Sequence, residues 1–291
     1  MDINKTLAQE FSLRQEQVDN TVNLIDEGAT IPFIARYRKE VTGSLDDQIL
    51  RELSDRLTYL RNLEKRKEEV RTAITEQEKM TPEIENAISA AVTLVEVEDI
   101  YRPFKPKRRT RASIAREKGL EGLANIISLQ MTDKSLEAEA EKYISAEKGV
   151  ETVKDAIAGA MDIIAENISD EADYRIHIRK MTFDNGRITS VAKEPESKTV
   201  YEMYYNFEEP VKKIAGHRVL ALNRAEDEKV LTVKVEAPVE DILRYLEKQV
   251  ITRDNPNTTP VLKEIIADSY SRLIGPAIER EIRNDLTEKA E

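Results

Sequence analysis

The longest regular pattern in the chain places the strongest constraint on its fold. Apolar residues recur three, four or seven positions apart at Ile49, Leu53, Leu57, Leu60, Leu63, Val70 and Ile74. This spacing predicts one face of a helix of about thirty residues. Ser44 and Asp47 have the spacing of a capping box at its start. A second long helical pattern begins at Thr259, and Gly275-Pro276 is expected to kink or divide it.

Composition favours helices elsewhere as well, because Gly is scarce while Glu, Lys, Arg, Leu, Ile and Ala are abundant. One β-hairpin is expected, with strands at His217–Asn223 and Lys229–Glu236, since both segments are rich in Val and Leu and flank a polar stretch. Asp184–Gly186 fits either a hairpin turn or a helix stop. We favour the stop, because Arg187–Ser197 alternates poorly. The predicted fold class is mainly α: multi-helical, with long central helices, a helix-turn-helix-like N-terminal cluster and one β-hairpin.

The N-terminal cluster contains three short helical patterns with tight turns between them. The second pattern stops at Gly28, and Thr30 is placed to cap the third. Such a cluster resembles a helix-turn-helix, whose last helix would present Arg36, Arg38 and Lys39 to DNA. Trihelical clusters are more commonly pure packing units, so both interpretations stay open.

Four regions follow from these patterns. Residues 1–43 form the N-terminal helical cluster, and residues 44–216 form a central helical region that includes a basic segment at 101–118. Residues 217–236 form the hairpin, and residues 237–291 form C-terminal long helices.

The basic segment, Tyr101–Lys118, concentrates the positive charge of an acidic chain. It has a net charge of +7, whereas the whole chain has a net charge of -11. Pro103 and Pro106 prevent a continuous helix, because each lacks an amide hydrogen and restricts the residue before it. We therefore expect an extended arm, followed by a short helix that Thr110 caps and Gly119 ends.

Exposed Lys and Arg side chains on such an arm are candidates for phosphate contact. The candidate nucleic-acid-binding residues are Lys105, Lys107, Arg108, Arg109 and Arg111, with Arg36, Arg38 and Lys39 as a weaker second patch. The alternative is that the arm pairs with carboxylates of the chain itself and fixes the register of its helices. The chain has no Trp and only 5 Phe. This argues against a base-stacking platform, so contact with nucleic acid is expected to involve the backbone and not the sequence.

Catalytic and metal-binding patterns are absent from the sequence. There is no Cys, and the two His, His177 and His217, lie far apart. Phosphate-binding loops, the dinucleotide fingerprint and hydrolase motifs are all missing. An enzyme would have to be built around Asp46-Asp47 or Glu98-Asp99, whose acids have simpler roles as helix caps and solvated groups. We expect a non-enzymatic protein with no cofactor and no metal.

No apolar run approaches the ~20 residues that span a membrane, and the N-terminus lacks the pattern of a secretion signal. The expected location is therefore cytoplasmic, with no membrane partner.

Four blocks of sequence resemble one known family. They are Ile31–Asp47, Tyr101–Ala124, Tyr201–Glu228 and Asp268–Arg283. In this order they are similar to the Tex family of bacterial transcription accessory proteins, which is related to the eukaryotic elongation factor that travels with RNA polymerase II. None of the blocks is a catalytic motif.

The resemblance implies a helical N-terminal region within a longer nucleic-acid-binding protein. In the family an RNase-H-like domain without nuclease activity, helix-hairpin-helix modules and an OB-fold follow. The chain is similar to the N-terminal part only and stops where the RNase-H-like domain should begin, so it is expected to be a fragment.

The function implied is a non-catalytic scaffold that contributes to nucleic-acid backbone binding and to transcription. The expected partners are RNA or DNA, bound without sequence specificity and weakly in a fragment without the OB-fold, and RNA polymerase or its associated factors. The alternative is a protein–protein interaction module that docks the transcription machinery, in which the basic segment is purely structural.

Overall fold

The computed structural model describes residues 1–106 and 108–291. It divides into two compact units, Met1–Phe104 and Lys105–Glu291. Each unit has its own buried apolar core. The expectation of a mainly α fold is confirmed, with one small antiparallel sheet in the described part of the second unit.

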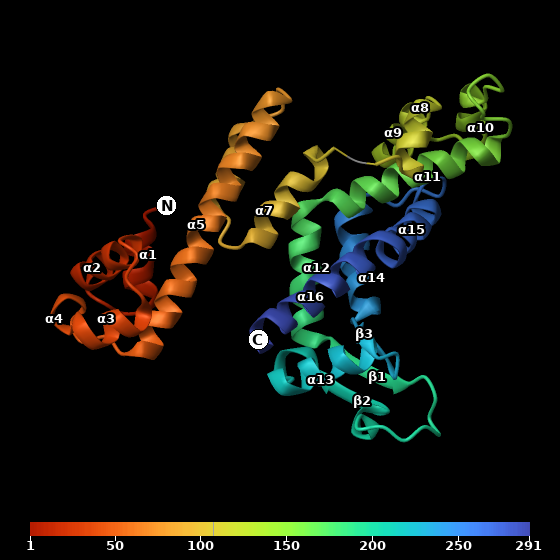
Figure 1. Ribbon diagram of the computed structural model, residues 1–291. Helices are drawn as coiled ribbons and strands as arrows, with labels where there is room; N and C mark the ends of the chain where they lie inside the picture. The colour runs from red at the N-terminus through yellow and green to blue at the C-terminus, as the bar shows by residue number, and fades with distance from the viewer. Residues whose placement is uncertain (107) are drawn as a thin grey trace. The chain divides into compact units, whose positions relative to one another are not determined.

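The first unit is organised around α5, which is the predicted long helix. Its elements are α1 (Ile3–Glu10), α2 (Gln15–Asp26), α3 (Ile31–Tyr37), α4 (Lys39–Thr42), α5 (Asp47–Glu76), α6 (Pro82–Ala90), α7 (Leu94–Tyr101) and a 3-10 helix (Arg102–Phe104). Helix α5 is 30 residues long, and α1, α3, α6 and α7 all contact it (Figure 1). Its buried leucines therefore lie at the centre of this unit's apolar core.

The start of α5 differs from the prediction. Asp46, not Ser44, is the N-cap, and its carboxylate accepts a hydrogen bond of 2.8 Å from the amide of Ile49. Ser44 instead has a positive φ of 65° in the turn that precedes the helix. Asp47 lies in the first helical turn and forms an ion pair with Arg51. Asp46 therefore caps the helix, whereas Ser44 belongs to the turn that follows Gly43.

The second unit surrounds α11, which α8, α9, α10 and α15 all contact. Its helices are α8 (Arg111–Glu117), α9 (Glu121–Leu129), α10 (Leu136–Ala140), α11 (Val153–Asp170), α12 (Ala172–Asn185), α13 (Gly216–Asp227), α14 (Val239–Val250), α15 (Thr259–Asp268) and α16 (Gly275–Ala290). Its 3-10 helices are Glu141–Tyr143, Glu202–Tyr204 and Val211–Lys213. The interruption expected at Gly275-Pro276 is a π-helix, Ser269–Ile274, which joins α15 to α16.

The sheet of the second unit has the order β2-β1-β3, with β1 (Arg187–Ala192) in the centre between β2 (Asn206–Pro210) and β3 (Leu231–Glu236). Both pairings are antiparallel, with Ile188 opposite Glu209 on one side and Val235 on the other. Helices α13 and α16 contact β3 (Figure 1).

The predicted hairpin is wrong, because His217–Asn223 lies within helix α13. Its buried residues Val219, Leu222 and Ala225 lie three apart, which is helical spacing. A short run of Val and Leu does not distinguish a helix from a strand. The polar stretch after it continues the helix instead of forming a turn. The predicted strand Lys229–Glu236 is confirmed in its second part as β3.

The true partner of β3 is β1, which the poor alternation of Arg187–Ser197 concealed. Strand β1 does alternate, but one of its inward positions is Ser190, which is 1% exposed. Its hydroxyl donates a hydrogen bond of 2.6 Å to the carbonyl of Tyr204. Ser190 therefore occupies a buried position where strands usually carry an apolar residue, and its hydrogen bond makes this burial possible. The helix stop predicted just before it is confirmed, since α12 ends at Asn185.

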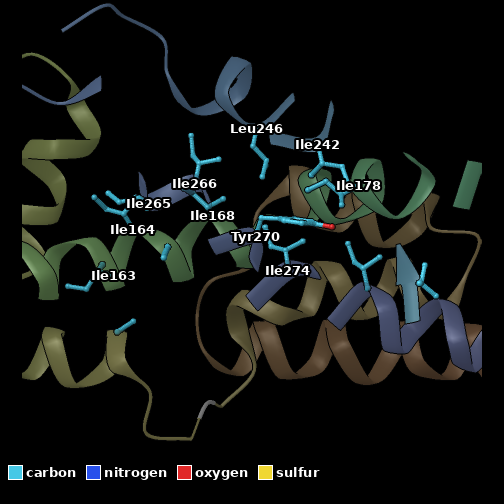
Figure 2. Packing of buried hydrophobic residues seen from close by; sticks show 14 of the residues in the cluster. Ile163, Ile164, Ile168, Ile178, Ile242, Leu246, Ile265, Ile266, Tyr270 and Ile274 are labelled. Atoms are coloured by element: carbon cyan, nitrogen blue, oxygen red, sulfur yellow. The ribbon is translucent and has the colours of Figure 1, made fainter. Parts of the chain in front are cut away.

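The core of the second unit joins side chains from helices far apart in the sequence. Figure 2 shows Tyr270, from the π-helix, among Ile178, Leu246 and Ile274. Ile178 belongs to α12 and Leu246 to α14, and both are fully buried. Burial raises the pKa of the Tyr270 hydroxyl above its usual value. The π-helix thus positions an aromatic ring at the meeting point of several helices.

Candidate nucleic-acid interface

The basic segment is less extended than the sequence predicts. Tyr101 is the last residue of α7, and the 3-10 helix follows it directly. Thr110 caps α8 as predicted, accepting a hydrogen bond of 3.0 Å from the amide of Ser113. Gly119, with a φ of 79°, follows the end of that helix. Among the described residues of this segment, the main non-helical stretch therefore lies between the 3-10 helix and α8.

Four of the five candidate residues in this segment are exposed. They are Lys105, Arg108, Arg109 and Arg111. The fifth, Lys107, lies outside the described residues. Arg109 forms an ion pair of 3.6 Å with Glu117, and both side chains are more than 60% exposed (71% and 63%). Within the described part of the chain, Lys105, Arg108 and Arg111 have no carboxylate within 4 Å.

Basic residues at the two ends of the segment have carboxylate partners. The guanidinium of Arg116 lies 3.0 Å from Glu121 and 3.4 Å from Glu166, which belongs to α11. Arg102 lies 3.8 Å from the fully buried Asp99. These pairs fit the alternative in which the segment pairs with carboxylates of the chain itself, whereas the described residues in the middle of the segment are exposed.

A cleft of about 390 Å³ adjoins the segment between α8 and α11. Arg111 and Lys118 line it together with Asp155 and Asp162. Burial raises the pKa of Asp162, although Arg272 and Arg111 act in the opposite direction. The cleft therefore has mixed charge.

The second patch lies on α3 and α4. Arg36 and Lys39 are exposed, and Arg38 is half-buried. Helices α2 and α3 are joined by a four-residue turn in which Gly28 has a φ of 90°. Thr30 caps α3 as predicted, and Ile34 is its one buried residue. Helix α3 therefore presents most of its length to solvent.

Two exposed aromatic side chains on this helix were not predicted as site residues. Phe33 is 39% exposed and Tyr37 is 55% exposed, and their ring centroids lie 5.3 Å apart. The guanidinium of Arg38 lies 4.9 Å from the centre of the Phe33 ring. The spacing of four positions between Phe33 and Tyr37 places both rings on one side of a helix, and the sequence already contains it. This spacing was overlooked because the scarcity of Trp and Phe in the whole chain argues against base stacking.

The carboxylate neighbours considered for catalysis have other partners. The carboxylate of Glu98 accepts hydrogen bonds from Arg66, and that of Asp99 lies 3.8 Å from Arg102. His177 stacks on Tyr245 with 3.9 Å between ring centroids, and His217 is exposed. Among the residues that the structure describes, no group of three His, Asp or Glu could hold a metal ion. None of the described helices is long and apolar enough to cross a membrane.

Family models match most of the chain. The Tex-like protein N-terminal domain matches residues 1–75, and the Tex central region-like model matches residues 132–291. The exposed part of the basic segment lies between these two matches.

Several relatives match at high identity. The chain is 49% identical over 292 residues to the uncharacterized protein YdcI of Bacillus subtilis, covering 99% of this chain and 41% of that protein. It is 44% identical over 234 residues to protein tex of Bordetella pertussis, covering 79% of this chain and 29% of that protein. It is 31% identical over 306 residues to human S1 RNA-binding domain-containing protein 1, covering 100% of this chain and 30% of that protein. The chain thus spans less than half the length of each of these relatives, and it belongs to the Tex family of transcription accessory proteins.

Proposed function

We propose that this chain is a non-catalytic helical scaffold that binds the phosphate backbone of RNA or DNA through the middle of its basic segment. The contacting residues are Lys105, Lys107, Arg108, Arg109 and Arg111. Arg36, Arg38 and Lys39 form a second contact surface. The chain acts in the cytoplasm, in transcription.

One observation carries the proposal: three exposed cations with no carboxylate within 4 Å in the described residues lie close together in the sequence of an acidic chain. Lys105, Arg108 and Arg111 lie within seven consecutive residues, and the chain as a whole has a net charge of -11. Ion pairs within the protein are the usual use of arginine in this chain, as Arg56, Arg61 and Arg66 illustrate. Unpaired guanidinium groups on a local positive surface are suited to phosphate oxygens, which they bind in a bidentate manner.

The names of two relatives also support a role in nucleic-acid binding and transcription. One is named for an S1 RNA-binding domain, and another is protein tex. A backbone contact in the scaffold would add to binding by other parts of a longer protein.

A second candidate function is a protein–protein interaction module that docks RNA polymerase or an associated factor. The observation in its favour is the ion pair of Arg116 with Glu166 of α11, which fits a basic segment that pairs with the chain's own carboxylates. In that case the exposed middle of the segment would contribute little to nucleic-acid affinity.

The test is fluorescence anisotropy with labelled single-stranded RNA and duplex DNA over a series of salt concentrations. The test variant carries Lys105→Glu, Arg108→Glu, Arg109→Glu and Arg111→Glu. The matched control makes the same change in charge at four exposed lysines elsewhere in the same unit, namely Lys134→Glu, Lys154→Glu, Lys198→Glu and Lys248→Glu.

The parent chain is expected to bind both probes, with affinity that falls steeply as salt rises. Each phosphate contact with a single strand contributes about 0.7 to the slope of log affinity against log salt, so four lost contacts lower that slope by about 3 units. The control should retain most of the slope, because it keeps the basic segment. Equal losses in the two variants, or no binding by the parent chain, would refute backbone binding by this segment.

A further inference from the structure

The exposed rings of α3 form a surface with a different chemistry from the basic segment. We define the α3 patch as Phe33, Arg36, Tyr37, Arg38 and Lys39. Phe33 and Tyr37 lie one helical turn apart on the solvent side of α3, with their planes inclined at 50°. Such a pair leaves ring surface open to a planar ligand.

Arginine side chains are held against these rings. Arg38 lies over Phe33, as described above, and donates a hydrogen bond of 2.9 Å to the carbonyl of Tyr37. The guanidinium of Arg36 lies 6.0 Å from the centre of the Tyr37 ring. The patch therefore combines two exposed rings with two guanidinium groups that contact them.

These arginines differ from others that lie over aromatic rings in the described residues. Arg56, over Tyr59, forms an ion pair with Glu10. Arg66, over Tyr101, forms one with Glu98.

Arg218, over Phe207, forms an ion pair with Glu209. Arg36 and Arg38 have no carboxylate within 4 Å in the part of the chain that the structure describes, and neither does Lys39. The cation–π contacts of the α3 patch therefore leave its positive charge available to an anionic partner.

A partner that satisfies both features must combine planar groups with negative charge. Unpaired nucleotides do so, because every base offers a flat π-face and every linkage carries a phosphate. Bases within a duplex are already stacked on each other, and their faces cannot reach a ring on a protein surface. The chemistry therefore selects a single strand over a duplex.

We propose that the α3 patch binds single-stranded nucleic acid by stacking unpaired bases on Tyr37 and Phe33, while Arg36 and Lys39 contact the adjoining phosphates. This inference rests on the proposed nucleic-acid binding and adds to it a preference for single strands. It replaces the expectation, drawn from the scarcity of aromatic residues, that every contact is to the backbone.

The first test uses the absence of Trp from the chain. The substitution Tyr37→Trp introduces a single tryptophan at the patch, and Val92→Trp introduces one at another exposed site of the same unit, where the native side chain is 57% exposed. Stacking of a base quenches tryptophan fluorescence. Saturating single-stranded RNA should quench the fluorophore at position 37 by a large fraction and the one at position 92 by little, whereas duplex DNA should quench neither. Equal quenching at both positions would overturn the proposal.

The second test measures affinity. The double variant Phe33→Ala and Tyr37→Ala keeps every charge, so its salt slope should stay unchanged. Its affinity for single-stranded RNA should fall at least about tenfold, because stacking on one aromatic ring contributes about fivefold or more per base. Its affinity for duplex DNA should change by less than about twofold, and Tyr37→Phe should retain the parent affinity. Circular dichroism should show the parent melting temperature, since both side chains are exposed.

The outcomes separate this inference from the proposed function. If the parent chain binds neither probe, nucleic-acid binding itself is refuted and the patch with it. If the parent chain binds RNA and the double alanine variant binds equally well, base stacking by the patch is refuted and the basic segment remains. A partner protein docked on the rings would give that second result.

Discussion

Replacing Gly186 with alanine tests how the second unit joins a helix to its sheet. Gly186 is buried between α12 and β1, with an ordinary backbone conformation of φ -77° and ψ 163°. A Cβ atom at this position would collide with the carbonyl oxygen of Thr182 and would lie 3.2 Å from that of Glu236. Both obstacles are backbone atoms, so no side-chain rotation can relieve the collision.

The size of the effect follows from what must move. The amide of Gly186 donates a hydrogen bond of 2.7 Å to the same Thr182 carbonyl, and the Gly186 carbonyl accepts one of 3.1 Å from Val211. Opening the junction weakens the first of these, and a buried amide without a partner costs about 1–3 kcal/mol. Overpacking adds about 1–3 kcal/mol, and the stiffer unfolded chain offsets about 0.4–1 kcal/mol. We expect Gly186→Ala to lower the free energy of unfolding by about 3 kcal/mol, within the range of strongly destabilising substitutions.

Differential scanning calorimetry is the assay. In a unit of this size, about 3 kcal/mol corresponds to a melting temperature lowered by about 6–12 °C. The neighbouring exposed residue gives a matched control, because Asn185→Ala should change stability by less than about 0.5 kcal/mol. Gly28→Ala isolates backbone strain, since a Cβ there meets no atom within 4 Å but φ is 90°; it should cost about 1–2 kcal/mol. If Gly186→Ala is no more destabilising than Asn185→Ala, the junction is plastic and the steric argument is wrong.

Two further predictions concern polar contacts. The side chain of Gln130 is only 4% exposed. It donates a hydrogen bond of 2.8 Å to the carbonyl of Val250 and accepts one of 3.0 Å from the amide of Thr252. Gln130→Ala leaves both backbone groups without this partner, so it should lower the free energy of unfolding, measured by thermal unfolding, by about 2–4 kcal/mol. Hydrogen bonds from Arg56 hold the pKa of Glu10 below its usual value of 4.5. The pair therefore adds stability above that pH and loses it as the pH falls through the lower folded-state pKa. Because the pair is one-third exposed, Glu10→Gln should lower stability by less than about 1 kcal/mol at pH 7, and urea titration at a pH below the folded-state pKa should show no difference from the parent chain.

The sequence predicted those helices whose signals are local. The long apolar stripe predicted α5, and Thr30 and Thr110 were identified as N-caps because a cap needs only a side-chain oxygen within three residues of the amide it accepts from. The helix stop before Gly186 was found for the same reason. At α5, two acids and a serine competed for one cap, and only the conformation of the turn decided between them.

The sheet could not be predicted in the same way, because its register depends on residues far apart in the chain. Ser190 lies on the inward face of β1, and its hydroxyl is satisfied by the carbonyl of Tyr204. A polar residue on the buried face removes the alternation by which a strand is recognised. The Val- and Leu-rich run beginning at His217 had enough apolar residues for a strand, but it forms helix α13, which packs beside α16.

The candidate interfaces illustrate the same limit for charged and aromatic side chains. Sequence left two interpretations of the basic segment open, phosphate contact and an internal strap. Arg116 has its partner in Glu166, 50 positions further along the chain, so no local pattern could reveal that pair. Arg108 lies eight positions earlier in the same segment and has no carboxylate within 4 Å in the described residues. The two interpretations therefore apply to different residues of one segment: charge substitutions at its exposed middle residues test phosphate contact, whereas one at Arg116 tests the internal pairing.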